Sequence, residues 1–300
     1  MGDAWAEAAQ ALAAAHLDYG HGCTNAEDEA AWLVLHAAGL TAAEAGQFDA
    51  HARQALTAQQ LQQARAITAQ RIATRQPLAY LLGEAWLAGL RFTVDPRVIV
   101  PRSFIAELLD QGALDPWLGT PPQRILDMCT GSGCLAILAA LAWEDAGVDA
   151  ADLSPDALAV AQINRADYAL QDRVHLIASD LWSAFAAHPA SGYDLVLCNP
   201  PYVPTASMQA LPEEYRHEPV LALAGGADGM DLVRRFLRDA PPHLAPHAVV
   251  VLEVGNERAA FEVAFPQLPA VWLDTELHPE AVCLLLADDL RAAFAPGAST

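Results

Sequence analysis

The spacing of apolar residues changes along the chain and divides it into three regions. In residues 1–77, apolar positions such as Leu61, Ala64 and Ile67 recur every three to four residues, which is the period of an amphipathic helix. Helix starts are marked by three capping boxes: Thr24 with Glu27, Thr41 with Glu44, and Thr57 with Gln60. Helix ends are marked by Gly20, Gly22, Gly39 and Pro77. We therefore expect residues 1–77 to form a small N-terminal helical domain. As a separate hypothesis, which the pattern itself does not show, this domain recognises the substrate.

Residues 78–122 have the pattern of a hairpin followed by a linker. Strand-like runs at 80–86 and 90–94 flank Ala88-Gly89, which predicts a β-hairpin. A short apolar strand is expected at 98–100, and Ser103 is expected to cap a helix over 104–109. Three prolines and a glycine within 115–122 predict a linker to the next domain.

In residues 123–300, strands and helices alternate. Strands are predicted at 124–128, 147–152, 173–178, 194–198 and 248–254, and helices at 135–143, 155–167 and 229–239. A final pair at 270–276 and 282–287 is expected to close the sheet as a hairpin. Such alternation is typical of an α/β domain with a mainly parallel sheet covered by helices on both faces. Ligands bind to such sheets at the carboxyl ends of the strands, where the strand order reverses.

The net charge of −21 is the main compositional signal. All 16 basic residues are arginine, and their two clusters, at 53–75 and 234–238, are interpreted as solvated helix faces. An acidic surface repels nucleic-acid phosphates and attracts basic partners. Solubility alone explains the acidity equally well, so both explanations stay open.

Neither a metal site nor a membrane segment is expected. The five cysteines, at 23, 129, 134, 198 and 283, lack the spacing of metal ligands, which indicates a reducing cytoplasm and no structural zinc. No apolar run reaches the roughly 18 residues of a membrane span, and the start of the chain lacks the basic and apolar pattern of a secretory signal.

A glycine-rich loop follows the first predicted strand of the sheet. Gly131 and Gly133 lack the Cβ atoms that would keep a ligand from the backbone, and the following helix start favours a carboxylate. Asp127, four residues before Gly131, adds an anion for an ammonium group. A ligand that carries a carboxylate and an ammonium group side by side is an amino acid. Methionine is the amino acid whose sulfur is bonded to adenosine in a sulfonium cofactor. The loop therefore favours S-adenosylmethionine as the cofactor.

A dinucleotide is the competing ligand for this loop. Asp152, at the end of the second strand, suits ribose hydroxyls in either case. However, the G-x-G-x-x-G spacing fails, because residue 136 is alanine. Asp180, after the third strand, could accept a hydrogen bond from an adenine amino group, or it could simply cap the next helix.

The tetrapeptide Asn199-Pro200-Pro201-Tyr202 follows the fourth strand and has the composition of a methyl-transfer site. A planar amide or amino nitrogen is a poor nucleophile because its lone pair is delocalised. The Asn199 side-chain oxygen and the Pro200 carbonyl could accept both N–H protons and turn the nitrogen toward a methyl group. The prolines stiffen the turn, and Tyr202 offers a π face. An ordinary Pro-Pro turn is the alternative.

A strong general base is not required, because the nitrogen becomes acidic once it is methylated. His217 and Glu218 are therefore weak candidates for a base, and capping or packing of a loop explains them better.

Taken together, these motifs resemble the HemK-type protein-glutamine methyltransferases. The order of glycine loop, Asp152, Asp180 and Asn-Pro-Pro-Tyr behind a helical region matches over nearly the whole chain, weakly over 1–75 and strongly from Leu78. Residues 94–103, the Cys129–Cys134 form of the glycine loop, and residues 211–219 resemble the PrmB branch, which modifies the third protein of the large ribosomal subunit. Phe104 departs from that pattern, since a proline is expected there.

The resemblance implies a Rossmann-like class I S-adenosylmethionine-dependent methyltransferase fold. It assigns cofactor contacts to Cys129, Thr130, Gly131, Ser132, Gly133, Asp152, Asp180, Leu181 and Asn199. It assigns glutamine contacts to Asn199, Pro200, Pro201 and Tyr202. It also implies a basic ribosomal protein as the substrate, which suits the charge of this chain.

Four other functions compete with this interpretation. The nearest is glutamine methylation of peptide-chain release factors, the other branch of the family, whose members tend to carry Pro-Arg-Pro where Ser103 ends the motif here. A nucleic-acid amino-methyltransferase could use the same tetrapeptide, but a basic stripe is missing. A non-catalytic ribosome assembly factor would not need the tetrapeptide. An NAD-linked oxidoreductase would need a different glycine spacing.

Overall fold

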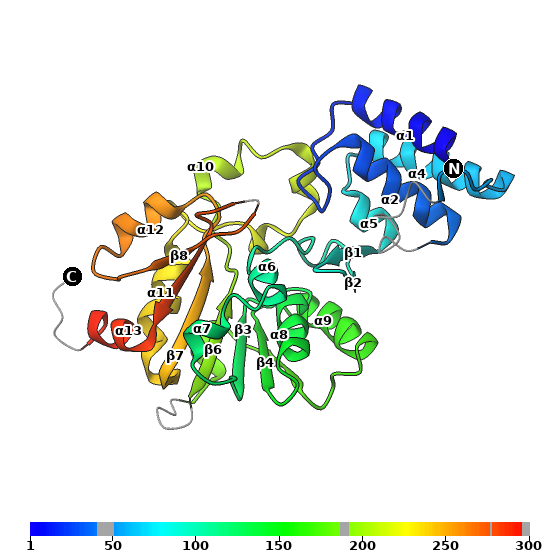
Figure 1. Ribbon diagram of the computed structural model, residues 1–300. Coiled ribbons are helices and arrows are strands. Elements are labelled where there is room, and N and C mark those ends of the chain that lie inside the picture. The colour runs from blue at the N-terminus through cyan, green and yellow to red at the C-terminus, as the bar shows by residue number, and fades with distance from the viewer. Residues whose placement is uncertain (41–50, 187–191, 277, 296–300) are drawn as a thin grey trace. The chain divides into compact units, whose positions relative to one another are not determined.

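The computed structural model describes residues 1–40, 51–186, 192–276 and 278–295 (Figure 1). Their packing separates two compact units. The first, here called the helical unit, contains Met1–Pro96, Val100–Arg102 and Leu211–Glu218. The second, the sheet unit, contains Arg97–Ile99, Ser103–Ala210 and the residues from Pro219 onward. The division into 1–77, 78–122 and 123–300 with separate roles remains a prediction.

None of the helices within the described ranges combines the length and the apolar run that crossing a bilayer requires.

The helical unit contains α1 (Gly2–Ala14), α2 (Ala26–Ala38), α4 (Ala58–Thr74), α5 (Leu78–Leu82), the strands β1 (Glu84–Leu87) and β2 (Leu90–Thr93), and the 3-10 helix η3 (Glu213–His217). Helix α1 buries Ala4, Ala8 and Leu12, which lie on one face because they are four residues apart. Leu12 of α1 and Leu33 of α2 have no exposed surface. Helical packing of the N-terminal region, predicted from its apolar period, is confirmed.

Two of the predicted caps can be compared with the structure. Thr57 and Gln60 form the expected capping box at the start of α4. The box predicted from Thr24 is wrong by one residue, because Asn25 caps α2 by accepting a hydrogen bond from the Asp28 N–H at 2.8 Å. Asparagine caps a helix as well as threonine does, so Asn25 can take the N-cap position that was predicted for Thr24. The box at residues 41–44 lies outside the described residues.

The hairpin is shorter than predicted. Residues 78–82 form α5, and strands β1 and β2 pair in antiparallel register around Ala88-Gly89. Both turn residues have positive φ, +48° and +73°, as a two-residue hairpin turn requires. The strand predicted at 98–100 is wrong: the Val100 N–H donates to the Glu218 carboxylate at 2.9 Å instead of to a neighbouring strand. Residues 115–122 begin with the short helix α7 (Asp115–Leu118).

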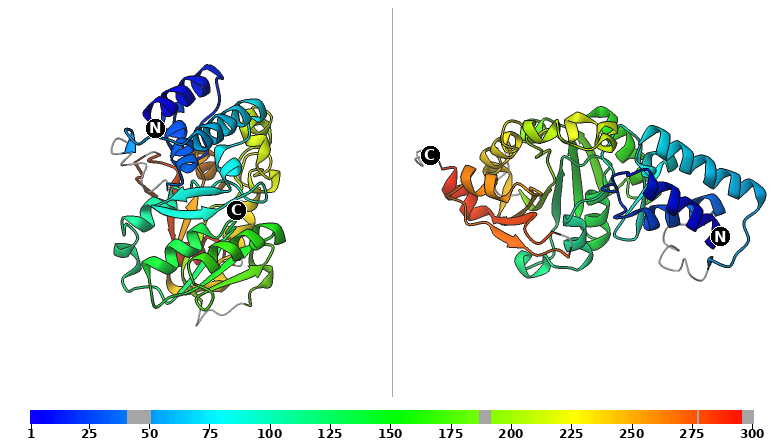
Figure 2. Two further views of the ribbon diagram at one scale, coloured as in Figure 1. Left: turned by 90° about the vertical axis from the view of Figure 1, so that its right-hand side faces the viewer. Right: turned by 90° about the horizontal axis from the view of Figure 1, so that it is seen from above.

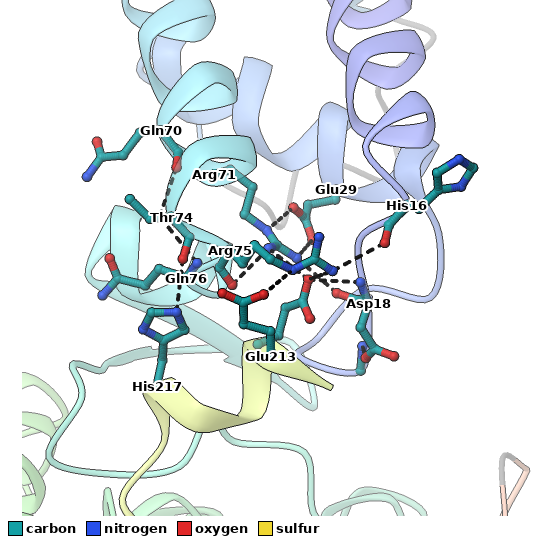
Figure 3. A network of polar contacts seen from close by, with 12 residues as sticks. His16, Asp18, Glu29, Gln70, Arg71, Thr74, Arg75, Gln76, Glu213 and His217 are labelled. Carbon is teal, nitrogen blue, oxygen red and sulfur yellow. Dashed lines mark hydrogen bonds and ion pairs between the residues drawn. The ribbon is translucent and has the colours of Figure 1, made fainter. Parts of the chain in front are cut away.

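Buried ion pairs join three segments of the helical unit (Figure 3). The Arg71 side chain is 1% exposed, and its Nε donates to Glu29 Oε1 at 2.7 Å. Arg75 lies 2.7 Å from Oε1 of the fully buried Glu214, which belongs to η3. The interpretation of the arginines at 53–75 as a solvated face is therefore wrong for Arg71. The paired charges replace the water that the guanidinium loses on burial.

The sheet unit contains a seven-stranded sheet in the order β5-β4-β3-β6-β7-β9-β8. Its strands are β3 (Arg124–Met128), β4 (Gly147–Asp152), β5 (Val174–Ala178), β6 (Tyr193–Cys198), β7 (Leu244–Glu253), β8 (Val271–Leu273) and β9 (Val282–Leu286). Strands β3 to β7 are parallel, and β9 is antiparallel to both β7 and β8. The predicted parallel sheet with a closing hairpin is confirmed.

Helices cover both faces of this sheet (Figures 1 and 2). The longer helices of the sheet unit are α6 (Ile105–Asp110), α8 (Cys134–Ala142), α9 (Pro155–Asp167), α11 (Asp231–Asp239), α12 (Arg258–Ala264) and α13 (Ala287–Ala293). The unit also contains the single-turn α10 (Thr205–Met208) and the 3-10 helices η2 (Leu181–Ala184), η4 (Val220–Ala222) and η5 (Pro241–His243). Leu126 and Met128 of β3 share a core with α11, α12 and α13. Asp127 points to the other face, where it contacts α8. The apolar pattern did not predict α12 and α13.

The order of the parallel strands reverses next to β3. The chain runs from β3 outward to β4 and β5, and then returns to place β6 on the other side of β3. The two motifs singled out in the sequence follow β3 and β6, so both lie at this switch point. Residues at the carboxyl ends of β3 and β6 are thereby brought together.

Candidate active site

A pocket lies at the carboxyl ends of the four strands β3, β4, β5 and β6, within the sheet unit. The loop after each strand contributes part of its wall: Met128, Cys129 and Gly131 after β3; Asp152, Leu153 and Ser154 after β4; Ser179, Asp180 and Leu181 after β5; Asn199 and Pro201 after β6. Further wall residues are Arg97, Val98, Ile99, Ala157, Pro219, Leu221, Ala222, Ala224 and Leu232. The pocket therefore occupies the position that the strand order predicts for a ligand.

The two glycines of the loop after β3 have different surroundings. Gly131 has φ +56°, and a Cβ built on it meets no atom within 4 Å, so this bend is open. The Gly131 N–H donates to Asp152 Oδ2 at 2.9 Å, which ties the loop to the end of β4. Gly133 has φ +81°, and a Cβ there would lie 3.2 Å from the Ala161 Cβ. Gly131 thus leaves room for a ligand, whereas Gly133 allows α8 to pack closely on α9.

Asp127, Thr130 and Ser132 are buried and do not belong to the pocket wall. The Thr130 hydroxyl donates to Asp127 Oδ2 at 2.5 Å, and the Ala136 N–H donates to the same oxygen at 3.0 Å. Burial raises the pKa of Asp127 to about 7 despite these donors. Within the described residues, the buried Asp127 Oδ1 has no hydrogen-bond partner. Asp127 therefore keeps one acceptor available behind the loop.

Asp152 is one of the residues that line the pocket. Oδ1 accepts the Ser154 N–H at 2.8 Å, and Oδ2 accepts the Gly131 N–H. Burial raises the pKa of Asp152, and the backbone donors oppose this shift. Both oxygens are thus oriented by the backbone, which fixes the direction of the carboxylate.

Asp180 and Leu181 also line the pocket. Asp180 is the N-cap residue of η2, so the capping alternative is correct, and its side chain is nevertheless part of the wall. Asp180 Oδ2 accepts a hydrogen bond from Arg235 at 2.8 Å. Arg235 had been interpreted only as part of a solvated helix face, and no sequence signal linked it to the site. Leu181 has φ +50°, a conformation that is uncommon outside glycine.

Two residues of the tetrapeptide line the pocket, and the other two pack against neighbouring parts of the sheet unit. Asn199 and Pro201 line the pocket, whereas Pro200 is buried. Among the described residues, none forms a hydrogen bond with the Asn199 side chain, so its oxygen and its NH₂ group remain available to a ligand. The Tyr202 ring lies against Gly255, and its hydroxyl donates to Glu253 Oε1 at 3.4 Å.

Glu253 is a site-associated residue that the sequence reasoning missed. It is the last residue of β7 and is 2% exposed. Burial raises its pKa to about 7, although Ser103, Phe104 and Tyr202 all donate to its carboxylate. The available signal was a single acidic residue at the end of the apolar run 248–254. Ser103 was expected to be the N-cap of a helix over 104–109, but α6 starts one residue later and Phe104 is its N-cap residue. The Ser103 Oγ accepts the Ile105 N–H at 3.2 Å, and it donates to Glu253.

His217 and Glu218 belong to the helical unit. Glu218 accepts two hydrogen bonds from Arg102, at 2.6 and 2.7 Å. Burial alone would raise the pKa of Glu218, but Arg102 and His21 lower it to about 2. His217 Nε2 lies 3.0 Å from the Thr74 carbonyl oxygen. The structural interpretation of both residues, as loop capping and packing, is confirmed.

Two family models match the chain. The one described as "Methyltransferase small domain" matches residues 104–213, and the one described as "PrmC N-terminal domain" matches residues 3–83. Among solved structures, the catalytic domain of hMettl16 in complex with the MAT2A 3′UTR hairpin 6 has a TM-score of 0.50 at 13% identity, over 80% of this chain and 84% of that one. This likeness concerns the fold alone.

Curated relatives match the chain almost from end to end. The ribosomal protein uL3 glutamine methyltransferase of Bordetella pertussis is 56% identical over 283 residues, which cover 93% of this chain and 92% of the relative. The enzyme of the same name from Burkholderia pseudomallei is 50% identical over 285 residues, which cover 93% and 91%. This chain therefore belongs to the uL3 glutamine methyltransferases of the HemK-type family and is a methyltransferase that uses S-adenosylmethionine.

Proposed function

We propose that this chain transfers a methyl group from S-adenosylmethionine to the side-chain amide nitrogen of a glutamine in ribosomal protein uL3. The observation that carries the proposal is the position of Asn199: its side chain, without a partner among the described residues, lines the same pocket as the open Gly131 bend. The names of the relatives support glutamine as the accepting residue and uL3 as the substrate.

The residues of the pocket fit the cofactor chemically. The open bend at Gly131 gives a methionine moiety access to backbone, and the oriented Asp152 carboxylate suits ribose hydroxyls. Asp180 suits an adenine amino group, and Leu153 and Leu181 would give the purine apolar contacts. Asp127, through the acceptor at Oδ1, would act on the ammonium from behind the loop. Contacts of Cys129, Thr130, Ser132 and Gly133 with the cofactor remain part of this proposal.

When bound, S-adenosylmethionine supplies an electrophilic methyl group on a positively charged sulfur. The task of the protein is then to present the lone pair of a poorly nucleophilic amide. In our proposal, the Asn199 oxygen and the Pro200 carbonyl accept one hydrogen bond each from the two amide N–H groups of glutamine and so orient its nitrogen. Both acceptors also stabilise the positive charge that develops on that nitrogen. Pro201 stiffens the turn, and Tyr202 places an aromatic ring beside it.

A general base is not part of the proposed mechanism. The nitrogen becomes strongly acidic once it carries the methyl group, so its proton is lost to water without assistance. The candidates that the sequence offered, His217 and Glu218, are instead engaged in structural contacts of the helical unit.

The charge of −21 supports a basic protein substrate and opposes direct binding of nucleic acid or of an anionic membrane surface. We propose that the helical region binds uL3 and that the enzyme acts in the cytoplasm, where a ribosomal protein substrate would be available.

The test uses purified enzyme, labelled S-adenosylmethionine and ribosomal proteins from cells that lack the gene. We expect a single labelled protein, uL3, with methylglutamine located by peptide mass spectrometry. Asn199→Ala should reduce the rate by ~100-fold or more, because it removes one of the two acceptors that stabilise the transition state. Asn256→Ala, an exposed asparagine of the same unit, is the matched control and should retain full activity. Labelling of a release factor, or full activity of Asn199→Ala, contradicts the proposal.

A further inference from the structure

The buried carboxylate of Glu253 lies beside the Asn199–Tyr202 turn. Strands β6 and β7 are parallel neighbours, with Cys198 opposite Leu252. Asn199 directly follows Cys198, and Glu253 directly follows Leu252. The catalytic turn and this carboxylate therefore leave the same edge of the sheet on adjacent strands.

Glu253 connects two segments that lie far apart in the sequence. Its Oε2 accepts the Ser103 hydroxyl at 2.6 Å and the Phe104 N–H at 2.9 Å. Its Oε1 accepts the Tyr202 hydroxyl at 3.4 Å. Phe104 stands where a proline was expected, and a proline would have no N–H to donate. One side chain thus holds both the approach to α6 and the end of the catalytic turn.

The Tyr202 ring has little freedom to move away from this contact. A Cβ on Gly255 would lie 2.6 Å from Tyr202 Cε2 and 2.9 Å from its hydroxyl oxygen, so the ring occupies the space that a side chain at 255 would fill. A Cβ on Gly229 would lie 2.3 Å from the Tyr202 carbonyl oxygen. Two glycines make room for Tyr202, and Glu253 fixes its polar end.

Burial of a carboxylate costs free energy, because its charge loses contact with water. A neutral side chain of similar size avoids the desolvation of a charge, so packing alone does not explain an acid at this position. The carboxylate becomes useful if it orients a side chain that the reaction needs. It also lies beside a turn where positive charge would develop.

We propose that Glu253 is a positioning residue for methyl transfer, which holds Tyr202, and through it the Asn199–Tyr202 turn, in the reactive orientation. This inference rests on the proposed role of the turn. It extends that role to a carboxylate that does not touch the substrate and acts only through Tyr202.

The inference gives the reaction a pH dependence. Burial raises the pKa of Glu253 to about 7, and the polar groups that face it are the Ser103 hydroxyl, the Phe104 and Ile105 N–H groups, the Tyr202 hydroxyl and, from β6, the Cys198 thiol. The ionised carboxylate accepts from these donors with both oxygens, whereas the protonated acid has an O–H of its own that points at one of the donors. The rate kcat should therefore rise with pH through about 7, because the ionised form holds the turn.

The first experiment measures kcat, KM and their pH profiles for Glu253→Gln and Glu253→Asp. Glu253→Gln should lower kcat by ~10-fold, leave the KM for S-adenosylmethionine within about twofold, and abolish the rise near neutral pH. Glu253→Asp keeps the charge and should restore part of kcat together with a pH-dependent limb. Binding of S-adenosylhomocysteine shows that each variant is folded. If Glu253→Gln keeps both the wild-type kcat and the wild-type pH profile, the inference is wrong.

A double-mutant cycle tests whether Glu253 acts through Tyr202. Tyr202→Phe removes only the hydroxyl, so Glu253→Gln should change kcat much less in that background than in the wild type. Equal effects in both backgrounds overturn the inference. Asp149→Asn is the matched control, because Asp149 accepts the Tyr193 hydroxyl at 2.5 Å at the other end of the sheet. This variant should not alter the kcat profile.

The two proposals fail in different ways. A fully active Asn199→Ala contradicts the proposed chemistry, whatever Glu253 does. An inactive Asn199→Ala together with a normal Glu253→Gln leaves the chemistry intact and removes only Glu253. If Glu253→Gln does not fold, the pH profile of kcat for the wild type and the kcat of Glu253→Asp still test the inference. A wild-type kcat that does not change around pH 7, together with a wild-type kcat in Glu253→Asp, contradicts it.

Discussion

The two units treat buried carboxylates in opposite ways. In the helical unit, Glu29, Glu214 and Glu218 each have an arginine within 2.7 Å. In the sheet unit, the buried Asp127 and Glu253 and the half-buried Asp152 are held by N–H and O–H donors, and among the described residues no arginine pairs with them. Paired charges fix the shape of the helical unit. Carboxylates without a cation leave their negative charge and their acceptor oxygens available to the pocket and to the Asn199–Tyr202 turn.

The largest expected effect comes from breaking a paired charge. Arg71→Ala leaves Glu29 buried without its cation and should lower the free energy of unfolding by about 3–5 kcal/mol. Urea unfolding followed by circular dichroism measures it. Arg65→Ala, which removes an exposed pair with Glu7, is the control and should leave the midpoint unchanged. Equal losses in the two variants would contradict the distinction between the units.

The pH dependence of stability should have opposite signs in the two units. The pKa of Glu218 is lowered to about 2, so its stabilisation is present above the reference value of 4.5 and is lost as pH falls toward 2. The pKa of Glu253 is raised to about 7, so its contribution is present below 4.5 and is lost as pH rises through 7. Each change is on the order of 3 kcal/mol.

Urea midpoints measured between pH 3 and pH 8 check these signs. Glu218→Gln should be most destabilising at the upper end of this range, and Glu253→Gln at the lower end. If the destabilisation changed with pH in the same direction in both variants, pairing with arginine would not determine the sign of the pH dependence.

Within the sheet unit, the two glycines of one loop should separate binding from packing. Gly131→Ala places a methyl group toward the open bend and should weaken S-adenosylhomocysteine binding by ~10-fold, as measured by calorimetry. Gly133→Ala brings a Cβ to 3.2 Å from Ala161 and should instead lower stability by about 1–3 kcal/mol. A Gly133→Ala variant that loses affinity but not stability would reverse these assignments.

The smallest effect is expected at Arg235. Its pair with Asp180 is nearly half exposed on both sides, so Arg235→Ala should change S-adenosylhomocysteine affinity by no more than about threefold. The difference should disappear at 1 M salt, because screening removes the interaction in the wild type as well. A large effect that persists in salt would instead place Arg235 in direct contact with the cofactor.

The sequence predicted the sheet unit well because local signals and tertiary packing agree there. Strands such as β3 and β4 are short apolar runs bounded by turn residues, and both motifs end up on one pocket because parallel strands align their carboxyl ends. The starts of α9 and α4 were predictable because a side chain within three residues satisfies the free N–H groups.

What the sequence did not reveal depends on contacts between distant residues. Glu253 and Ser103 are separated by 150 positions, and Arg71 and Glu29 by 42. No local period marks such a pair. Val98–Val100 reads as a strand by composition, but Val100 bonds to Glu218, so no ladder forms. Gly131 and Gly133 look equivalent in the sequence and differ only in what lies opposite each of them.

The membership of Leu211–Glu218 in the helical unit has a consequence for biosynthesis. Glu214 and Glu218, which complete the ion pairs of Arg75 and Arg102, are made only after more than two thirds of the 300 residues have been synthesised. The amino-terminal helices therefore emerge from the translating ribosome with cations that still lack their partners. Their final stability is reached late in translation, and a fragment that ends at Pro96 would never reach it.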